Sequence, residues 1–189
     1  LDAAATRFDL PGGTIAGADP ATVTPIERFD DPAFQRNITE SVAHAWYEGD
    51  WTRHPWEEET VPKYTDWDDN GDYSWVKAPR FDGKPMQVGP LAQVLMGLAS
   101  GDERFSNYGT YVLEQAGKLA GAKLGPAVLH STIGRHAARC IRAVVLSDLA
   151  LEHWSLLANN IAGGDTDIFN PPTFPKGEQR GFGFHEAPR

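Results

Sequence analysis

The sequence predicts a mainly helical fold with α+β character at its edges, in which part of a helical bundle is wrapped by long aromatic loops. Two observations carry this prediction. Three stretches between residues 90 and 162 repeat apolar residues at the helical period, and glycine or proline bounds them. Residues 48–89 are instead rich in aromatic rings and lack that period, so they must pack the rings against another surface.

The first part of the chain, 1–89, is predicted to be a loop-rich arm with short strands and one short helix. Residues 1–37 are rich in turn-forming residues, and short apolar pieces between them, such as 23–26, are expected to form edge strands or arms. The apolar residues within 38–47 recur at helical spacing, which predicts the short helix there.

The second part, 90–162, is predicted to be the bundle. A first helix is expected over 90–100, with Pro90 in its first turn, and a second over 102–120. The third, over 126–162, is apolar or small at almost every position, so we expect it to be buried inside the bundle. Residues 163–189 return to loop. Without its missing neighbours or a partner subunit, the chain is expected to expose large apolar faces of the helices 90–100 and 126–162.

Composition excludes several classes of protein. A formal net charge of -9 argues against nucleic acid and anionic membranes as direct partners, because both require a basic surface. The single cysteine excludes an internal disulfide framework and any multi-cysteine metal site within this sequence. No apolar run approaches the roughly 20 residues needed to span a bilayer. Because the sequence starts at Leu1 and stops abruptly at Arg189, we expect both ends to be cuts in a longer protein.

Two arginine-bearing segments are candidates for chemistry. The segment 181–189 ends in Pro188-Arg189, and a guanidinium on a proline-fixed backbone suits holding a charged or polarised group in a pocket. Its alternative is a glycine-punctuated strand that leads into a turn. The segment 134–142 places three arginines on one side of a helix, where they form structural ion pairs or contact a substrate or cofactor.

Other candidates have simpler interpretations. The acidic segment 66–72 resembles the opening of a calcium loop, but its twelfth position is Lys77, and Asn70-Gly71 favours a turn. The six histidines show no metal-binding spacing and are interpreted as hydrogen-bonded core or surface residues. Cys140 lies among apolar residues and is expected to be a small buried side chain.

Taken in order along the chain, several short motifs resemble one protein family. They are Glu40-Ser41-Val42, Trp46-Tyr47-Glu48-Gly49, His54-Pro55, Lys63-Tyr64-Thr65, Tyr73-Ser74-Trp75-Val76-Lys77-Ala78-Pro79-Arg80, Val88-Gly89-Pro90-Leu91-Ala92, Ser131-Thr132-Ile133-Gly134-Arg135 with Ala138-Arg139, and Glu186-Ala187-Pro188-Arg189. This set is similar to the central to late part of the large, catalytic subunit of nickel–iron hydrogenases.

The resemblance implies a fold, an activity and a set of partners. Residues 1–189 would be an internal fragment of one large-subunit domain, with 163–189 leading to an active-site arginine. The complete subunit would split or form H2 heterolytically at a nickel–iron centre whose iron carries CN and CO ligands. In the family, four cysteines from two Cys-x-x-Cys motifs hold the metals, and an iron–sulfur small subunit takes the electrons. Neither motif occurs in this sequence, so none of its residues is expected to ligate the metals.

The resemblance also assigns a site. Arg189, with Pro188 beside it, matches the family arginine over the open side of the metal centre, where a fixed cation helps a heterolytic split. Arg80 matches a different family position and receives no catalytic role.

Two hypotheses follow. In the first, the sequence is part of a working hydrogenase, inactive by itself, that needs the remainder of the large subunit and the small subunit. In the second, which the missing cysteines support, it is a non-catalytic remnant or scaffold without metal. The compartment stays open between the cytoplasm and attachment to a membrane, on its periplasmic side, through the partner.

Overall fold

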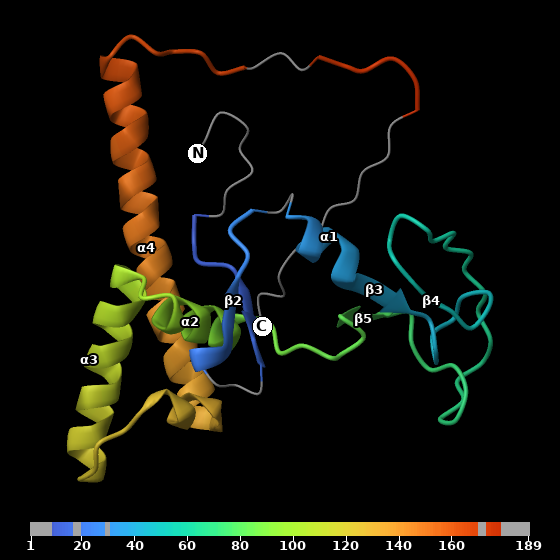
Figure 1. The fold of residues 1–189 in the computed structure, drawn as a ribbon, viewed down its shortest axis with the longest axis horizontal. Helices are drawn as coiled ribbons and strands as arrows, with labels where there is room; N and C mark the ends of the chain where they lie inside the picture. The colour runs from blue at the N-terminus through green and yellow to red at the C-terminus, as the bar shows by residue number, and fades with distance from the viewer. Residues whose placement is uncertain (1–8, 17–19, 29–30, 170–172, 179–189) are drawn as a thin grey trace. The chain divides into compact units, whose positions relative to one another are not determined.

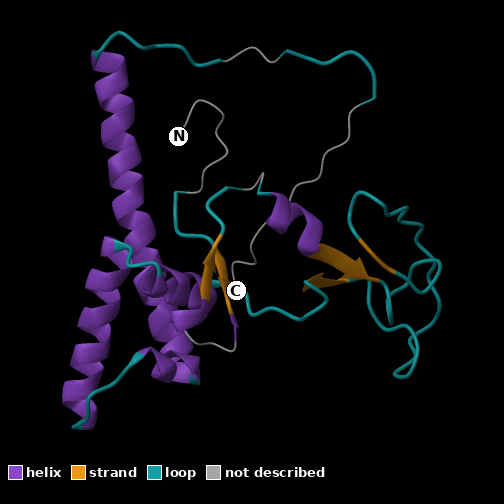
Figure 2. Ribbon diagram, in the orientation of Figure 1, coloured by secondary structure: helices purple, strands orange, loops and turns teal. Residues whose placement is uncertain are grey.

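The computed structural model describes residues 9–16, 20–28, 31–169 and 173–178, which fall into two compact units. The helical unit comprises Phe8–Glu27 with Val88–Glu178, and the loop–sheet unit is Arg28–Gln87, in each case as far as the residues are described. Three long helices and two small antiparallel sheets form the regular structure of this part of the chain (Figures 1 and 2). None of these described helices is both long enough and apolar enough to cross a membrane.

The helices of the helical unit start and stop at specific capping residues. Helix α2, Pro90–Ala99, has proline in its first turn. Helix α3, Glu103–Ala120, starts where the Asp102 carboxylate accepts a hydrogen bond from the Phe105 backbone N–H, and it ends at Gly121 in the left-handed conformation. Helix α4, Thr132–Ala162, starts where the hydroxyl of Ser131 accepts from the backbone N–H of Gly134.

These three helices confirm the sequence prediction, with one correction. Residues 126–130 do not belong to the long helix; they form a separate 3₁₀ turn, η3, Pro126–His130. Ser131 interrupts the helical backbone because it is extended, with φ -70° and ψ 163°, and acts as the N-cap of α4.

Strands β1, Gly13–Ile15, and β2, Val23–Pro25, pair antiparallel, and the 3₁₀ turn η2, Pro20–Thr22, leads into β2. The predicted strand near residue 23 is therefore confirmed.

The core of the helical unit lies where α2, α3, η3 and the first half of α4 meet. Its buried side chains are Leu91, Val94, Leu95, Phe105, Leu113, Leu129, Ala138, Ile141, Val145 and Leu149. Helix α2 also contacts β1 and η2, so most of its surface is covered. Our expectation that the 90–100 helix would expose a large apolar face is wrong for this reason.

The second half of α4 differs from the first, because it extends beyond α2 and α3 (Figure 1). Its large apolar side chains are at least half exposed: Leu151, Trp154, Leu156, Leu157 and Ile161. The prediction of a helix buried along its whole length is therefore wrong, whereas the prediction that this helix exposes apolar side chains is confirmed. Exposed apolar side chains gathered in this way are typical of an interaction surface.

The loop–sheet unit is built around a three-stranded antiparallel sheet in the order β4-β3-β5. Its strands are β3, Ile38–Ser41, β4, Thr52–Arg53, and β5, Ala78–Phe81, and the short helix α1, Pro32–Asn37, precedes β3. The predicted helix over 38–47 is wrong. Its first four residues form the central strand, because pairing with two neighbouring strands outweighs a short helical apolar pattern.

Gly97 in α2 provides a test of the packing of the helical core. A Cβ at this position would overlap the ring of Phe105, which is fully buried. Gly97→Ala is therefore expected to lower the free energy of unfolding by about 1–3 kcal/mol, measured by chemical denaturation of the complete subunit. Gly125→Ala is the control, because a Cβ there meets nothing within 4 Å and φ is -112°. Equal stability of the two variants would contradict the described packing.

Candidate functional site

A lysine between two carboxylates forms the most extensive polar cluster among the described residues of the loop–sheet unit. Lys77 lies just before β5, and its Nζ donates to Oε2 of Glu40 at 3.3 Å and to the hydroxyl of Thr60 at 2.8 Å. It also donates to Oε2 of Glu58 and forms an ion pair with it. Because Glu40 is on β3 and the other two partners are in the loop after β4, the cluster joins three segments far apart in sequence.

Aromatic rings complete the surroundings of this lysine. Nζ of Lys77 is 5.6 Å from the ring centroid of Tyr47 and 5.5 Å from that of Trp51, which are cation–π distances. The side chains of Lys77 and Glu58 are only 17% and 6% exposed. We refer to Glu40, Glu58, Thr60 and Lys77, with these two rings, as the Lys77 cluster.

The cluster shifts the protonation of two of its members. Burial raises the pKa of the Glu40 carboxyl above 4.5, and the hydrogen bond and charge of Glu58 add to this, against the opposing effect of Lys77. Burial lowers the pKa of Lys77, but its hydrogen bonds and ion pairs with Glu58 and Glu40 outweigh burial, so the net shift is upward. The raised pKa of Lys77 means that its ion pairs stabilise the folded state. This stabilisation is fully present below pH 10.5, the ordinary pKa of lysine, and is lost as the pH rises through the raised pKa.

The chemistry of the Lys77 cluster is that of a structural clamp. The ammonium donates to three oxygens and faces two rings, so no donor remains for a substrate. In the sequence, Lys77 stands out as the wrong residue for a calcium loop and as part of a family motif, and neither observation predicts the cluster. Its carboxylate partners are 37 and 19 positions away, and no short-range pattern indicates them.

The acidic segment 66–72 forms a turn, as predicted. Oδ1 of Asp68 accepts from the backbone N–H of Asn70 at 2.9 Å, and its carbonyl oxygen accepts from the N–H of Gly71 at 3.1 Å. The carboxylate of Asp68 therefore supports the turn itself.

The structure agrees with the predicted role of His44 but contradicts the predicted burial of Cys140. His44 Nδ1 lies 2.7 Å from the carbonyl oxygen of Gly71, and its ring stacks on Tyr73, which agrees with a hydrogen-bonded structural role. Cys140 is exposed, so the prediction that it is buried is wrong. Helix α4 turns Ala138 and Ile141 toward the core, and Cys140 lies off that stripe.

The three arginines of α4 have different environments. Arg135 and Arg142 are partly buried and take part in intramolecular interactions, whereas Arg139 is exposed. The interpretation as structural ion pairs and the interpretation as a substrate or cofactor contact both stay predictions.

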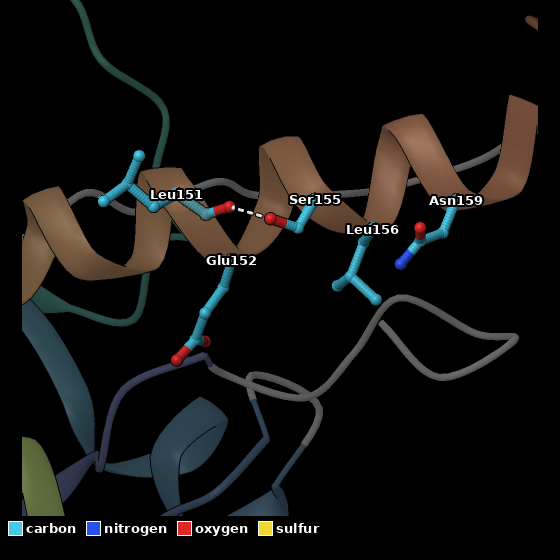
Figure 3. A pocket seen from close by; sticks show the side chains of 5 residues that line it. All are labelled: Leu151, Glu152, Ser155, Leu156 and Asn159. Atoms are coloured by element: carbon cyan, nitrogen blue, oxygen red, sulfur yellow. Dashed lines mark hydrogen bonds between the residues drawn. The ribbon is translucent and has the colours of Figure 1, made fainter.

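The second half of α4 carries an open hollow lined by Leu151, Glu152, Ser155, Leu156 and Asn159. Figure 3 shows Glu152, Leu156 and Asn159 extending from the same side of the helix, while the Ser155 hydroxyl donates to the carbonyl oxygen of Leu151. The hollow contains one titratable side chain, that of Glu152, which forms an ion pair with Arg104. It lacks the paired groups that acid–base catalysis needs, and its leucines extend the exposed apolar face of α4.

Polar contacts join α3 to α4 above the core. The Tyr108 hydroxyl donates to Oδ2 of Asp148 at 2.6 Å, and Arg104 donates to Oε2 of Glu152 at 3.0 Å. The hydrogen bond to Asp148 raises the pKa of Tyr108, with smaller contributions from burial and from the Asp148 charge.

The Tyr108 contact predicts a pH dependence of stability. Because the pKa of Tyr108 is raised in the folded state, the contribution of this contact to stability is fully present below pH 10.0, the ordinary pKa of tyrosine. It is lost as the pH rises through the raised pKa. Tyr108→Phe is therefore expected to lower the melting temperature at neutral pH and to reduce the further loss above about pH 10. Thermal melts of the complete subunit across this range measure both effects. The control is Tyr111→Phe, because the Tyr111 ring is 61% exposed; the same change in both variants would contradict the assigned contact.

The residues assigned by resemblance, Arg189 and Pro188, lie outside the described residues, as does the rest of 179–189. Within the described part of the chain, no three His, Cys, Asp or Glu side chains are grouped so that they could hold a metal ion. The only cysteine, Cys140, is exposed on α4. The described residues therefore do not fit the ligand set of a nickel–iron centre.

Comparison with known proteins identifies the class. The family model for nickel-dependent hydrogenases matches residues 1–189. The chain belongs to this family, and it corresponds to part of the hydrogenase large subunit. The resemblance found in the ordered sequence motifs is thereby confirmed.

Individual relatives define the similarity further. The Hydrogenase-2 large chain of Escherichia coli (strain K12) is 42% identical over 183 residues, which cover 96% of this chain and 32% of the relative. The uptake hydrogenase large subunit of Afipia carboxidovorans is 35% identical over 209 residues, covering 95% of this chain and 33% of the relative. The chain thus spans about a third of the length of these curated relatives. A solved [NiFeSe]-hydrogenase of Dm. baculatum is 28% identical, with a TM-score of 0.44 over 69% of this chain and 25% of that one.

Proposed function

We propose that this chain is part of a hydrogenase large subunit that splits or forms H2 heterolytically and passes the electrons to an iron–sulfur small subunit. The observation that carries the proposal is the family match over residues 1–189. The relative from Escherichia coli supports it, because the similarity extends over 96% of the chain and is not limited to one motif.

The metals in this proposal are held elsewhere in the subunit. A nickel–iron centre with CN and CO on the iron supplies the chemistry of H2 activation. Its cysteine ligands belong to parts of the large subunit that this sequence does not include, since the sequence contains one cysteine. The described residues contribute the fold, and no step of the reaction is assigned to them.

Arg189 is the residue that we propose acts in the reaction. Its guanidinium stays protonated, so it provides a permanent positive charge in the pocket where the H–H bond is split. Charge separates during that split, and a fixed cation in a water-poor pocket stabilises it without reorganisation. Pro188 restricts the backbone next to Arg189 and limits the positions that the side chain can reach.

The exposed face of α4 indicates how this part fits into the complete subunit. We propose that the remainder of the large subunit covers Leu151, Trp154, Leu156, Leu157 and Ile161. Burial of apolar area supports that assembly at about 25 cal/mol per Å2. In the same proposal, residues 1–189 belong to one domain, in which the aromatic loops before residue 90 wrap the helical bundle of 90–162.

Isotope exchange tests the proposed reaction directly. Heterolytic cleavage of D2 in ordinary water leaves one deuterium as hydride and one as an exchangeable deuteron, so HD is released. The purified native enzyme that contains this sequence is expected to form HD from D2 under anaerobic, reducing conditions. Failure to form HD by a preparation with stoichiometric nickel and iron would contradict the proposal.

A further inference from the structure

One buried oxygen of the Lys77 cluster lacks a hydrogen-bond donor. The ammonium of Lys77 donates to Oε2 of Glu40, to Oε2 of Glu58 and to the hydroxyl of Thr60, which uses all of its protons. Oε1 of Glu58 is buried and accepts no hydrogen bond within the described part of the chain. A carboxylate oxygen in this position has lost its hydration without gaining a partner, which is unfavourable.

The cluster also holds two acidic groups against one cation. Oε2 of Glu40 and Oε2 of Glu58 both pair with the same nitrogen, Nζ of Lys77. The side chain of Glu58 is buried and those of Glu40 and Lys77 are mostly buried, so water screens the two negative charges only in part. Two carboxyl groups that share one site in this way resist being ionised together.

The cations on the neighbouring strands are engaged elsewhere. Arg53 is the residue opposite Glu40 on β4, but its guanidinium lies over the ring of Trp51, 5.3 Å from the ring centroid. The residue opposite Glu40 on β5 is Pro79, and the next residue, Arg80, donates to the carbonyl oxygen of Pro79. Lys77 is therefore the cation that Glu40 and Glu58 share.

The one hydroxyl on the aromatic side of the cluster is engaged as well. The ring of Tyr47 faces Lys77, but its hydroxyl donates to the carbonyl oxygen of Trp75 at 2.9 Å. It is therefore not the missing donor to Glu58.

A proton on Glu40 removes both defects of the cluster. A protonated carboxyl group has an O–H donor, and the carboxyl groups of Glu40 and Glu58 lie within hydrogen-bond reach of each other. The same proton removes one of the two negative charges. The pKa of Glu40 agrees with this direction, because burial raises it, and the hydrogen bond and charge of Glu58 add to the effect against that of Lys77.

We propose that Glu40 is a proton-binding switch that determines how tightly the loop after β4 is held to the sheet. As the pH falls, Glu40 takes up a proton and donates it in a hydrogen bond to Oε1 of Glu58. Glu58 then no longer competes with a second carboxylate for the charge of Lys77. Because Glu40 belongs to β3 and Glu58 to the loop, the proton adds one bond between the two segments.

The expected pH dependence is opposite to that of an ordinary ion pair. Because the pKa of Glu40 is raised, the folded protein holds this proton at pH values above 4.5 where the unfolded chain has lost it. The stabilisation is fully present below pH 4.5 and is lost as the pH rises through the raised pKa. If Glu40 acted only as an ion-pair partner of Lys77, acidification would weaken the contact instead.

Hydrogen exchange of the native enzyme that contains this sequence tests the proposal. After correction for the intrinsic pH dependence of amide exchange, residues 54–62 are expected to exchange several-fold more slowly at about pH 5 than at about pH 8. Equal or faster exchange of these residues at the lower pH would overturn the proposal.

A matched pair of variants separates Glu40 from other carboxyl groups. In Glu40→Gln the amide N–H2 takes the place of the protonated carboxyl, so slow exchange of 54–62 is expected at both pH values. Glu59→Gln is the control, because Glu59 is exposed in the same loop, and it is expected to keep the native pH response. Faster exchange in Glu40→Gln than in the native protein at about pH 8 would contradict the proposal, since it is the result expected of a simple ion pair.

Infrared difference spectra between the same two pH values detect the proton itself. The carbonyl band of a protonated carboxylic acid is expected in the native protein and in Glu59→Gln, and a component of it is expected to be missing in Glu40→Gln. Identical difference spectra of the two variants would contradict the assignment of the proton to Glu40.

Discussion

Replacing Arg189 by lysine in the complete subunit is expected to lower the rate of H2 turnover about 100-fold or more while the metal content stays unchanged. Lysine keeps the charge but loses the planar fork of donors, so its charge is not held in the same position. Turnover is measured as HD formation from D2, and nickel and iron are measured on the same samples.

Arg80→Lys is the matched control for this prediction. Arg80 ends the string Lys77-Ala78-Pro79-Arg80, which parallels Ala187-Pro188-Arg189, but it lies on β5 and donates to the carbonyl oxygen of Pro79. We expect this variant to retain nearly full turnover. If both arginine variants lose turnover to the same extent, Arg189 has no special role in the reaction.

Replacing Lys77 by methionine is expected to lower the free energy of unfolding by about 3 kcal/mol. Methionine has a similar length but no charge, so the carboxylate of Glu58, only 6% exposed, loses its cation, and so does that of Glu40. Buried charge without a partner is the main cost. The effect is measured at neutral pH, where the stability linked to the raised pKa of Lys77 is fully present.

Lys63→Met is the control for the Lys77 variant, because Lys63 is exposed in the same unit. Its loss is expected to change stability by less than about 0.5 kcal/mol. A Lys77→Met protein as stable as this control would show that the cluster does not hold the loop after β4 to the sheet. Hydrogen exchange over residues 54–62 reports the same event locally, as faster exchange in the Lys77 variant only.

The helices could be predicted from the sequence because their signals are local. Proline in the first turn of α2, the cap Asp102 and Gly121 after α3 all act within a few residues of the helix ends. The cap Ser131 was missed, because the apolar period continues across it. The strand β3 could not be predicted in this way. Its conformation depends on pairing with Thr52–Arg53 and Ala78–Phe81, and the apolar pattern alone fits a helix equally well.

Burial could be predicted less well than helix formation. The apolar period of α4 continues to residue 161, but the last of its buried side chains is Leu149. The pattern indicates which side of the helix is apolar, but it does not indicate how far other elements of the fold cover that side. For the same reason the environment of Cys140 was misjudged: apolar neighbours in sequence are not neighbours in space.

The candidate sites also differ in whether the sequence alone could indicate them. The Arg189 assignment came from a family motif and stays a prediction, because this residue lies outside the described part of the chain. The Lys77 cluster emerged only from the structure, since Glu40 and Glu58 approach Lys77 through the folding of the loop onto the sheet. The aromatic residues of 48–89 were visible in composition, but the exposure of their rings was not.

The central claim is that this sequence belongs to a working, nickel-containing large subunit whose metal ligands lie outside residues 1–189. The most direct test is the intact mass of the purified native chain, with nickel and iron measured on the same sample. We predict a mass well above 20.7 kDa together with stoichiometric nickel and iron. A chain of 20.7 kDa without metal and without HD formation would contradict the claim and favour a non-catalytic scaffold.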